Sequence, residues 1–383
     1  MHWPMPVLVF LWSAAFVLYV LIGYPLLLAA WARGHAQPIR KEFFPRRVSI
    51  IVPVRNGAAW IESKIQSLLL SDYPEGLLDI LFVSDGSTDA TNQLVAEYPD
   101  SRVRLLALEG GGKARAVSSA FQHVDGEVLV LTDVRQSFHP AAIRYMVSCF
   151  ADASVGVVTG ELVIREGNNQ EEHNTGLYWK YEKWIRRNLN RIDAMLGATG
   201  SIYAIRRELA VPMPDDILLD DVYLPFIAAF KGHRIYFEDE AKAYDLPTSL
   251  NSEFWRKVRT QAGVYQIMKH FPALISPLNR RFIHFLSHKL GRLFLPFAML
   301  AVAISSFWLP EPSRVLMLSL QAIFYGLAVL DPVIPEGSPL KRISAVIRAF
   351  VVLVAAAACA LTVFIRPARS LWRETQVSAV QGK

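Results

Sequence analysis

Two hydrophobicity patterns divide the chain. Residues 5–31 form an apolar run without a charge, and three further apolar runs follow at 293–309, 315–330 and 343–365. Runs of this kind are typical of helices that cross a bilayer, which takes about 20 residues. Residues 46–283 instead mix polar and apolar positions, as in a globular domain. We therefore expect a soluble domain between an N-terminal anchor and a C-terminal membrane region.

We expect the first apolar run to be a membrane anchor; the alternative is a cleaved signal peptide. A signal peptide needs a basic start and a short apolar stretch, whereas no Lys or Arg precedes residue 5 and the run is too long. Basic residues follow it at once: Arg33, Arg40, Lys41, Arg46 and Arg47. The positive-inside rule then places the soluble domain in the cytoplasm and the protein in the cell (inner) membrane as a multi-pass protein.

The C-terminal runs do not all fit this rule. Lys341 and Arg342 agree with a cytoplasmic loop between the last two runs. Three further spans, however, would put Arg366, Arg369 and Arg373 outside. We therefore expect one C-terminal run to be interfacial or re-entrant, with no preference among the three.

Short strands and helices alternate through the first half of the soluble domain. Runs rich in β-branched residues predict strands at 48–54, 79–85, 103–108 and 128–133. Between them we expect helices, the first capped by Asn56 and the next two at 87–96 and 114–123. This alternation predicts an α/β fold with a mostly parallel sheet and helices on both faces. Ligands of such sheets bind at the carboxyl ends of the strands.

Composition narrows the function. The mean hydropathy is +0.27 and the net charge +6, with much of the basic excess beside apolar segments. This charge pattern favours membrane lipids and anionic phosphates and argues against nucleic acid. Cys149 and Cys359 have no metal-ligand spacing, which excludes a zinc site or a disulfide scaffold. The expected segments are an anchor at 1–33, a soluble domain at 46–250, amphipathic interface helices at 251–283, a membrane region at 284–366 and a tail at 367–383.

Acidic and glycine-rich segments follow the predicted strands. Asp85 ends one strand, where its carboxylate can accept hydrogen bonds from a base or ribose; the alternative is a turn with Asp89 as a helix cap. A glycine run leading into Lys113 opens a helix and suits a diphosphate, although a flexible loop has the same composition. Asp133 ends another strand and suits a divalent cation, or caps the next segment.

Two later segments also carry candidate chemistry. Asp220 and Asp221 precede an apolar helix, where the helix dipole stabilises carboxylates, but a carboxylate with a raised pKa would also suit a general base. Residues 253–271 form an amphipathic helix of the kind that lies on a membrane surface. Such a helix could also carry Arg259 to a diphosphate.

Together these segments resemble family 2 of the inverting glycosyltransferases, in particular the membrane-integrated polysaccharide synthases (relatives of cellulose, hyaluronan and chitin synthases). The resemblance covers residues 48–266 and rests on the order of its motifs. The matching positions are Pro53 and Asn56 in the opening motif, Asp85 in the uridine-binding turn, Lys113 on the diphosphate side, Asp133 as the first acid of Asp-x-Asp, Gly200 in the acceptor loop, Asp220 and Asp221 as the acidic pair, and Arg256, Arg259, Gly263 and Gln266 where the Gln-x-x-Arg-Trp helix belongs.

Three departures from the family pattern affect the expected chemistry. Arg135 replaces the second acid of Asp-x-Asp, which weakens the case for metal and makes Arg135 itself a candidate phosphate contact. Ser84 replaces the first acid of the uridine-binding pair. Arg256 and Thr260 replace the Gln and Trp of processive synthases, so the resemblance leaves open whether the product is a polymer.

The resemblance implies an A-type glycosyltransferase fold, a UDP-sugar donor, Mg²⁺ or Mn²⁺ on Asp133, and Asp221 as the base, with Asp220 beside it. The acceptor is then a glycan or a lipid-linked molecule. The leading interpretation is transfer to a growing polysaccharide of the exopolysaccharide type. The alternatives are non-processive transfer of one sugar to a lipid or lipid-linked acceptor and, as a minor one, an inactive nucleotide-binding assembly subunit.

Overall fold

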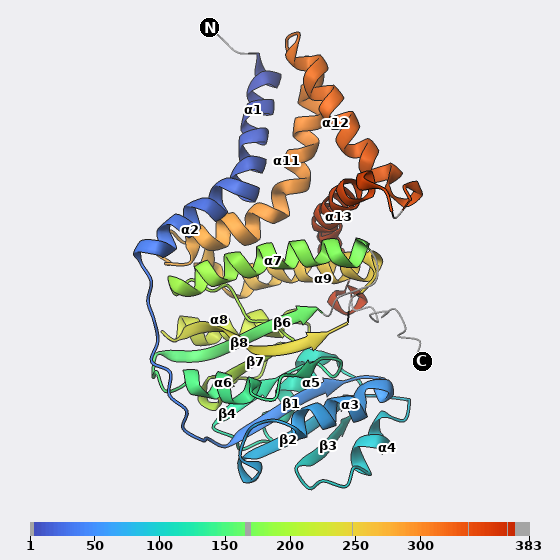
Figure 1. The fold of residues 1–383 in the computed structure, drawn as a ribbon. Helices are drawn as coiled ribbons and strands as arrows, with labels where there is room; N and C mark the ends of the chain where they lie inside the picture. The colour runs from blue at the N-terminus through green and yellow to red at the C-terminus, as the bar shows by residue number, and fades with distance from the viewer. Residues whose placement is uncertain (1–3, 165–169, 247, 336, 366, 372–383) are drawn as a thin grey trace. The chain divides into compact units, whose positions relative to one another are not determined.

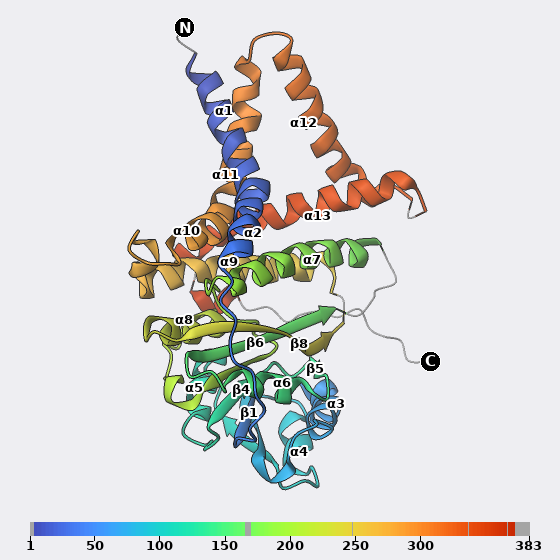
Figure 2. The same cartoon turned by 60° about the vertical axis from the view of Figure 1, so that its left-hand side comes forward.

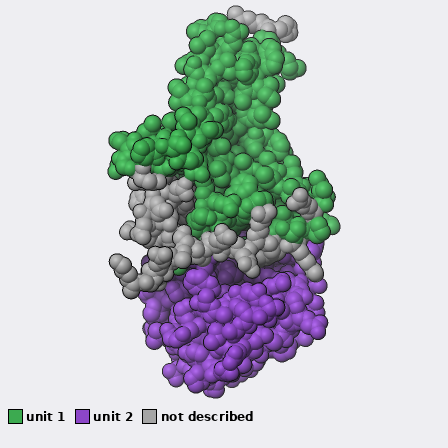
Figure 3. Space-filling model, turned by 90° about the vertical axis from the view of Figure 1, so that its right-hand side faces the viewer, with its two compact units in different colours: residues 1–34, 166–188, 246–383 green, residues 35–165, 189–245 purple. Residues whose placement is uncertain are grey.

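The computed structural model describes residues 4–164, 170–246, 248–335, 337–365 and 367–371. The chain forms two compact units, coloured separately in Figure 3. One contains Met1–Gly34, Glu166–Asn188 and Leu246–Lys383, and the other contains His35–Arg165 and Leu189–Asp245. We call them the helical unit and the sheet unit.

The sheet unit is built on one eight-stranded mixed sheet (Figure 1). Its strands, in chain order, are β1 (Val48–Val54), β2 (Leu78–Asp85), β3 (Val103–Leu108), β4 (Val128–Leu131), β5 (Ser137–Phe138), β6 (Val155–Ile164), β7 (Tyr203–Arg206) and β8 (Arg234–Asp245). The spatial order is β3-β2-β1-β4-β7-β6-β8-β5. Strands β1 to β4 are parallel, as the alternation predicts, and β7 runs antiparallel to both β4 and β6. The carboxyl ends of β1, β2 and β4 therefore share one edge.

Helices cover this sheet with apolar faces. They are α3 (Ala58–Leu69), α4 (Thr91–Ala96), α5 (Lys113–Ala120), α6 (Ala142–Cys149) and α8 (Asp220–Phe230). The apolar spacing of the sequence predicts that Ile61, Ile65, Leu68 and Leu69 share one side of α3; the first three are fully buried, whereas Leu69 is half-buried. The predicted cap of α3 is wrong. Gly57 is the N-cap, and the N–H of Ala58 donates to Asp89. Asn56 has a positive φ of 50° and bonds instead to the loop after β2.

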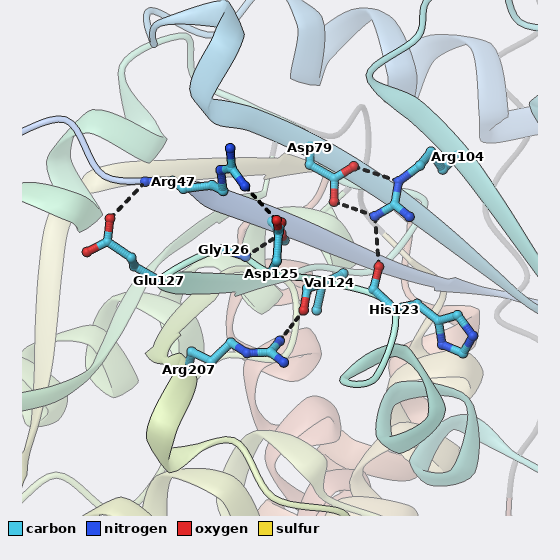
Figure 4. A network of polar contacts seen from close by, with 10 residues as sticks. Arg47, Asp79, Arg104, His123, Val124, Asp125, Gly126, Glu127 and Arg207 are labelled. Atoms are coloured by element: carbon cyan, nitrogen blue, oxygen red, sulfur yellow. Dashed lines mark hydrogen bonds and ion pairs between the residues drawn. The ribbon is translucent and has the colours of Figure 1, made fainter.

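A polar network ties together the opposite, amino-terminal edge of the parallel strands (Figure 4). Arg104 makes a bidentate pair with Asp79 at 2.8 and 2.7 Å and also donates to the carbonyl of His123. Arg47 pairs with Asp125 at 2.5 Å. These ion pairs are largely exposed, so each contributes little to stability, about 0–1 kcal/mol. They join strand ends and take no part in the site described below.

The helical unit contains long apolar helices. They are α1 (Met5–Leu18), η1 (Tyr19–Gly23), α2 (Tyr24–Gly34), α10 (Phe282–His284), η5 (Phe285–Leu290), α11 (Gly291–Ser305), α12 (Ser313–Leu330) and α13 (Pro339–Cys359). In the described residues, four helical stretches are long and apolar enough to cross a membrane: Met5–Gly34, Phe282–Trp308, Ser313–Val333 and Pro339–Phe364. The predicted anchor and the three predicted C-terminal runs each fall on one of them.

Two more helices complete this part of the chain. They are α7 (Gln170–Arg191), which begins in the helical unit, and the amphipathic α9 (Leu250–His270). Helix α1 packs against α11, while α13 packs against α9, α11 and α12. Most of the predicted tail, residues 372–383, lies outside the described residues, as does Arg366.

Candidate active site

The loops after β1 and β2 are bonded to each other. Asn56, which follows β1, accepts a hydrogen bond from the N–H of Thr88 at 2.8 Å and donates its own N–H to Ser87 at 3.1 Å. Pro53 lies half-buried on β1, paired in register with Val83 of β2. The two residues predicted from the opening motif therefore lie beside the turn that contains Asp85.

Asp85 holds the glycine run. Its carboxylate accepts from the N–H of Gly111 at 2.6 Å and from the N–H of Gly112 at 2.9 Å, and the residue is only 6% exposed. Gly86, at φ +67°, lies so close to the run that an added Cβ would come within 2.7 Å of the nitrogen of Gly110. The structure thus gives Asp85 a loop-holding role that sequence reasoning missed. Contact with a base or ribose stays a prediction, since a carboxylate can accept about four hydrogen bonds.

Lys113 joins two of the predicted acids. Its Nζ lies 2.9 Å from Oδ1 of Asp133 and 3.1 Å from Oδ1 of Asp220, at the start of α5. Burial by itself would lower the pKa of Lys113, but Asp133, Asp220 and Asp221 outweigh it and raise the pKa. The ammonium is therefore charged at neutral pH. It lies where charge on a bound diphosphate could replace one of these carboxylates as its partner.

The two adjacent acids at the start of α8 have different surroundings. Asp220 is 5% exposed and accepts from the hydroxyl of Tyr203 at 3.3 Å as well as from Lys113. Asp221 is more exposed, and its Oδ2 accepts from the N–H of Gly200 at 3.0 Å. An added Cβ on Gly200 would lie 3.2 Å from that oxygen, so the glycine permits the approach. The buried acid is thus an internal ion-pair partner, while Asp221 is the one suited to meet a substrate.

Tyr203 was missed by sequence reasoning, because a tyrosine within a strand gives no functional signal. Burial, together with the charge on Asp220, raises its pKa well above the ordinary value. Its hydroxyl therefore stays protonated and donates to Asp220.

Arg135 makes a buried ion pair. Its Nε and Nη2 donate to the two oxygens of Asp245 at 2.8 and 2.6 Å, and Gln136 donates to the same carboxylate at 2.8 Å. Asp245 ends β8 and is 5% exposed. Its position at a strand end was a signal that sequence reasoning did not use. A phosphate contact by Arg135 stays a prediction, and such a contact would have to share the guanidinium with Asp245.

A second missed residue, Lys64, lies beneath the Asp133 loop. Its side chain is 1% exposed, and Nζ donates to Thr132 Oγ1 at 2.7 Å and to the carbonyl of Gln136 at 2.6 Å. Thr132 in turn donates to the carbonyl of Ser201 at 2.7 Å, next to the acceptor-loop glycine Gly200. Burial lowers the pKa of Lys64 to about 7. A lysine on the apolar face of α3 was a signal that could have revealed it.

The donor set around Asp133 suits a cation only in part. No cluster of three or more His, Cys, Asp or Glu side chains in the described parts of the chain could hold a metal ion. Mg²⁺, however, is commonly bound by one or two carboxylates together with substrate phosphates. The 41% exposed carboxylate of Asp133 can supply one such ligand. The residues therefore fit a cation completed by the donor diphosphate rather than a site made by protein alone.

The remaining predicted residues lie on α9, in the helical unit. Arg256 pairs with Glu253 one turn earlier, and Glu253 also accepts from Thr248 at 2.7 Å. Arg259 and Gln266 recur with Arg256 at a helical spacing, so the three lie along one side of α9. All three belong to the helical unit, whereas Asp133, Asp220 and Asp221 belong to the sheet unit.

This fold and the loops at its strand ends define a class of protein: the chain has the GT-A fold, which is typical of glycosyltransferases that use nucleotide-sugars. Residues 49–211 match the family model described as Glycosyl transferase family 2. This match covers less than half of the chain, and it makes that segment similar to family 2 glycosyltransferases.

Known proteins agree with this assignment. The chain is 24% identical over 253 residues to the probable glycosyltransferase YdaM of Bacillus subtilis (strain 168). This alignment covers 62% of this chain and 60% of YdaM. It is 28% identical over 116 residues to the beta-monoglucosyldiacylglycerol synthase of Nostoc sp. (strain PCC 7120), covering 29% of this chain and 25% of that protein. The chain thus spans less than two thirds of the length of either relative.

Among solved structures, the mannosyltransferase PcManGT from Pyrobaculum calidifontis, in complex with GDP-Man and Mn²⁺, is similar with a TM-score of 0.68. The alignment covers 90% of this chain and 96% of PcManGT at 22% sequence identity. Similarity at this identity establishes a shared fold.

Proposed function

We propose that the protein is a membrane-bound, inverting glycosyltransferase that transfers a sugar from a UDP-sugar to a growing polysaccharide of the exopolysaccharide type. One observation carries the proposal. The half-buried carboxylate of Asp221 is held by the N–H of Gly200 at 3.0 Å, directly beside the ion-paired group of Lys113, Asp133 and Asp220. A carboxylate next to a cation that can bind diphosphate is what base-assisted sugar transfer requires.

The proposed reaction is one in-line displacement. Asp221 takes the proton of the acceptor hydroxyl as its oxygen bonds to the anomeric carbon. The bond from that carbon to the UDP oxygen breaks with its electron pair, so UDP leaves and the configuration inverts. Lys113 offsets the charge on the departing diphosphate, and the family resemblance gives Arg259 the same role. A cation on Asp133, when bound, would supply further electrostatic stabilisation of the diphosphate.

Donor recognition is assigned to the loops after β1 and β2. Asn56 and Asp85 are proposed for the nucleoside, and Asp85 also presents the glycine run through its bonds to Gly111 and Gly112. Backbone N–H groups of such a run suit phosphate oxygens. UDP is the expected carrier because the Asp85 turn resembles the family's uridine-binding turn.

The second candidate function is transfer of a single sugar to a lipid or lipid-linked acceptor. Thr260 favours it, because this small side chain bonds back to the carbonyl of Arg256 at 2.9 Å where processive synthases carry a Trp. The Nostoc relative is named for synthesis of a glucosylated lipid. If the acceptor is instead a glycan, the small side chain of Thr260 should leave more space around the acceptor than a Trp would. We then expect products of widely varying length.

One experiment tests both candidates. The purified full-length protein is incubated in bilayers with radiolabelled UDP- and GDP-sugars, each with and without added lipid acceptors, and the products are sized. A broad ladder of sugar polymer supports the first candidate, and one sugar on a lipid supports the second. Asp221→Asn protein is the matched control. If the wild-type protein binds UDP but forms no product with any donor, the inactive-subunit alternative replaces both.

A further inference from the structure

Helix α13 differs in direction from the other apolar helices of the helical unit. In Figure 2, α1, α11 and α12 rise together, whereas α13 runs across them, as α9 does. Helix α13 packs against α9 as well as against α11 and α12. By length and hydropathy, Pro339–Phe364 could cross a membrane, but length and hydropathy do not set direction.

The beginning of α13 is fixed to the end of α12. Asp331, fully buried just after α12, accepts from Lys341 Nζ at 3.3 Å, from Ser344 Oγ at 2.7 Å and from Arg348 Nη1 at 3.2 Å. Lys341 also donates to the carbonyl of Asp331 at 2.8 Å. Three side chains spread over about two turns of α13 therefore converge on one residue at the end of α12.

The end of α13 is fixed to α9. The ring of Phe364 contacts the ring of Tyr265 on α9, with centroids 5.0 Å apart. The short helical turns Ala360–Phe364 and Ala368–Leu371 also pack on α9. Helix α9 is amphipathic and lies outside the four apolar stretches that could cross a membrane.

These two attachments lie on one side of any membrane that both preceding apolar stretches cross. Phe282–Trp308 and Ser313–Val333 are each long and apolar enough to cross, and two successive crossings return the chain to its starting side. The end of α12 is therefore on the side where α9 lies. A helix that starts at one of these elements and ends at the other does not cross.

The charge pattern agrees. A crossing α13 would carry Arg348 into the bilayer, which is costly, and would place Arg366, Arg369 and Arg373 on the side opposite Arg33. The apolar side chains Leu340, Ile343 and Val346 are 46%, 57% and 41% exposed, whereas Lys341 and Ser344 are buried. This first half of α13 suits a helix lying at the headgroup boundary with its apolar side toward the acyl chains.

We propose that α13 lies in the plane of the membrane interface instead of crossing it. The chain then crosses three times, and residues 367–383 emerge on the same side as residues 35–245. This identifies the C-terminal run that is not a span and removes the conflict with the positive-inside rule. The proposal is independent of the reaction and of the acceptor.

Cysteine accessibility in sealed vesicles tests the proposal. Three single-cysteine variants are made in the full-length chain with both native cysteines replaced by alanine: Ser101→Cys in the sheet unit, Ser313→Cys at the first residue of α12, and Ser378→Cys in the tail. A membrane-impermeant maleimide is applied to right-side-out and to inverted vesicles. We expect Ser378→Cys to react from the same face as Ser101→Cys, and Ser313→Cys to react from the opposite face. Reaction of Ser378→Cys from the face of Ser313→Cys, or from both faces, would overturn the proposal.

A second measurement protects against misfolding of the cysteine-free chain. A fluorescent protein that matures only in the cytoplasm, or a phosphatase that is active only outside it, is fused after Lys383 of the unaltered sequence. The same reporters fused after Leu309 of a truncated chain mark the far side. We expect the two fusion sites to give opposite results. Matching results would place the tail across the membrane from the sheet unit and refute an in-plane α13.

Discussion

The acidic pair at the start of α8 provides a sharp test of the mechanism, because its two members differ in surroundings. Replacing Asp221 by Asn keeps the shape of the side chain and an oxygen that can accept from Gly200, but removes the base. General base catalysis typically contributes about 10² to 10⁴ in rate, which corresponds to about 2.7–5.4 kcal/mol of transition-state stabilisation. We expect Asp221→Asn to lose turnover by this factor.

The loss in Asp221→Asn should appear in kcat and not in donor binding or folding. Asp221 is not the closest partner of Lys113, whose Nζ lies 2.9 and 3.1 Å from Asp133 and Asp220. UDP affinity, measured by titration calorimetry, should therefore stay within a few-fold of wild type. The melting temperature should change by no more than about 2 °C, because the Asn side chain keeps an oxygen that can accept from the N–H of Gly200.

Asp220→Asn is the matched control, with the opposite expectation for stability. Asp220 is 5% exposed and bound to both Lys113 and Tyr203, so its neutralisation breaks a buried ion pair. Such a loss costs about 3–5 kcal/mol, and the lower end applies because Asp133 still pairs with Lys113. At about 2–4 °C per kcal/mol for a unit of this size, the melting temperature should fall by about 6–12 °C. An inactive Asp220→Asn with wild-type stability, together with an active Asp221→Asn, would show that the base has been assigned to the wrong carboxylate.

Three further predictions concern metal, stability and the interface helix. Asp133→Ala should weaken UDP binding mainly when Mg²⁺ or Mn²⁺ is present, as titration with and without EDTA would show; full wild-type activity in EDTA contradicts a metal role. Asp245→Ala should lower the free energy of unfolding by about 3–5 kcal/mol, because it leaves the buried charge of Arg135 without its carboxylate. If Arg135→Ala instead lowers UDP affinity and leaves the melting temperature unchanged, Arg135 contacts phosphate. Arg259→Ala should lower turnover equally in detergent and in bilayers, while Lys269→Ala should lower turnover in bilayers and leave it at the wild-type level in detergent. The opposite result for the two variants would show that Arg259 has no role in the reaction.

Much of the fold could be predicted from the sequence because its signals are local. The run at 48–54 is a strand with the predicted bounds, since β-branched residues without a polar alternation are typical of a strand buried on both faces. The stripe of Ile61, Ile65 and Leu68 predicts which face of α3 is buried, and the apolar runs predict the membrane helices. The order of the motifs along the chain was sufficient to suggest family 2.

The partners of the site residues needed the tertiary structure. Arg135 and Asp245 are 110 residues apart, and nothing in either local sequence says that β8 brings them together. Asp85 was expected to face a ligand, and only the close approach of Gly86 to Gly110 shows that the glycine run itself satisfies the carboxylate.

The direction of α13 was decided in the same way. Its composition satisfies the requirements of a span, but its ends are attached to α9 and to Asp331. Hydropathy and periodicity predict which side chains of a segment are buried, because this depends on the apolar positions within the segment itself. The identity of a partner depends on strand order and helix packing, which arise only when distant segments meet.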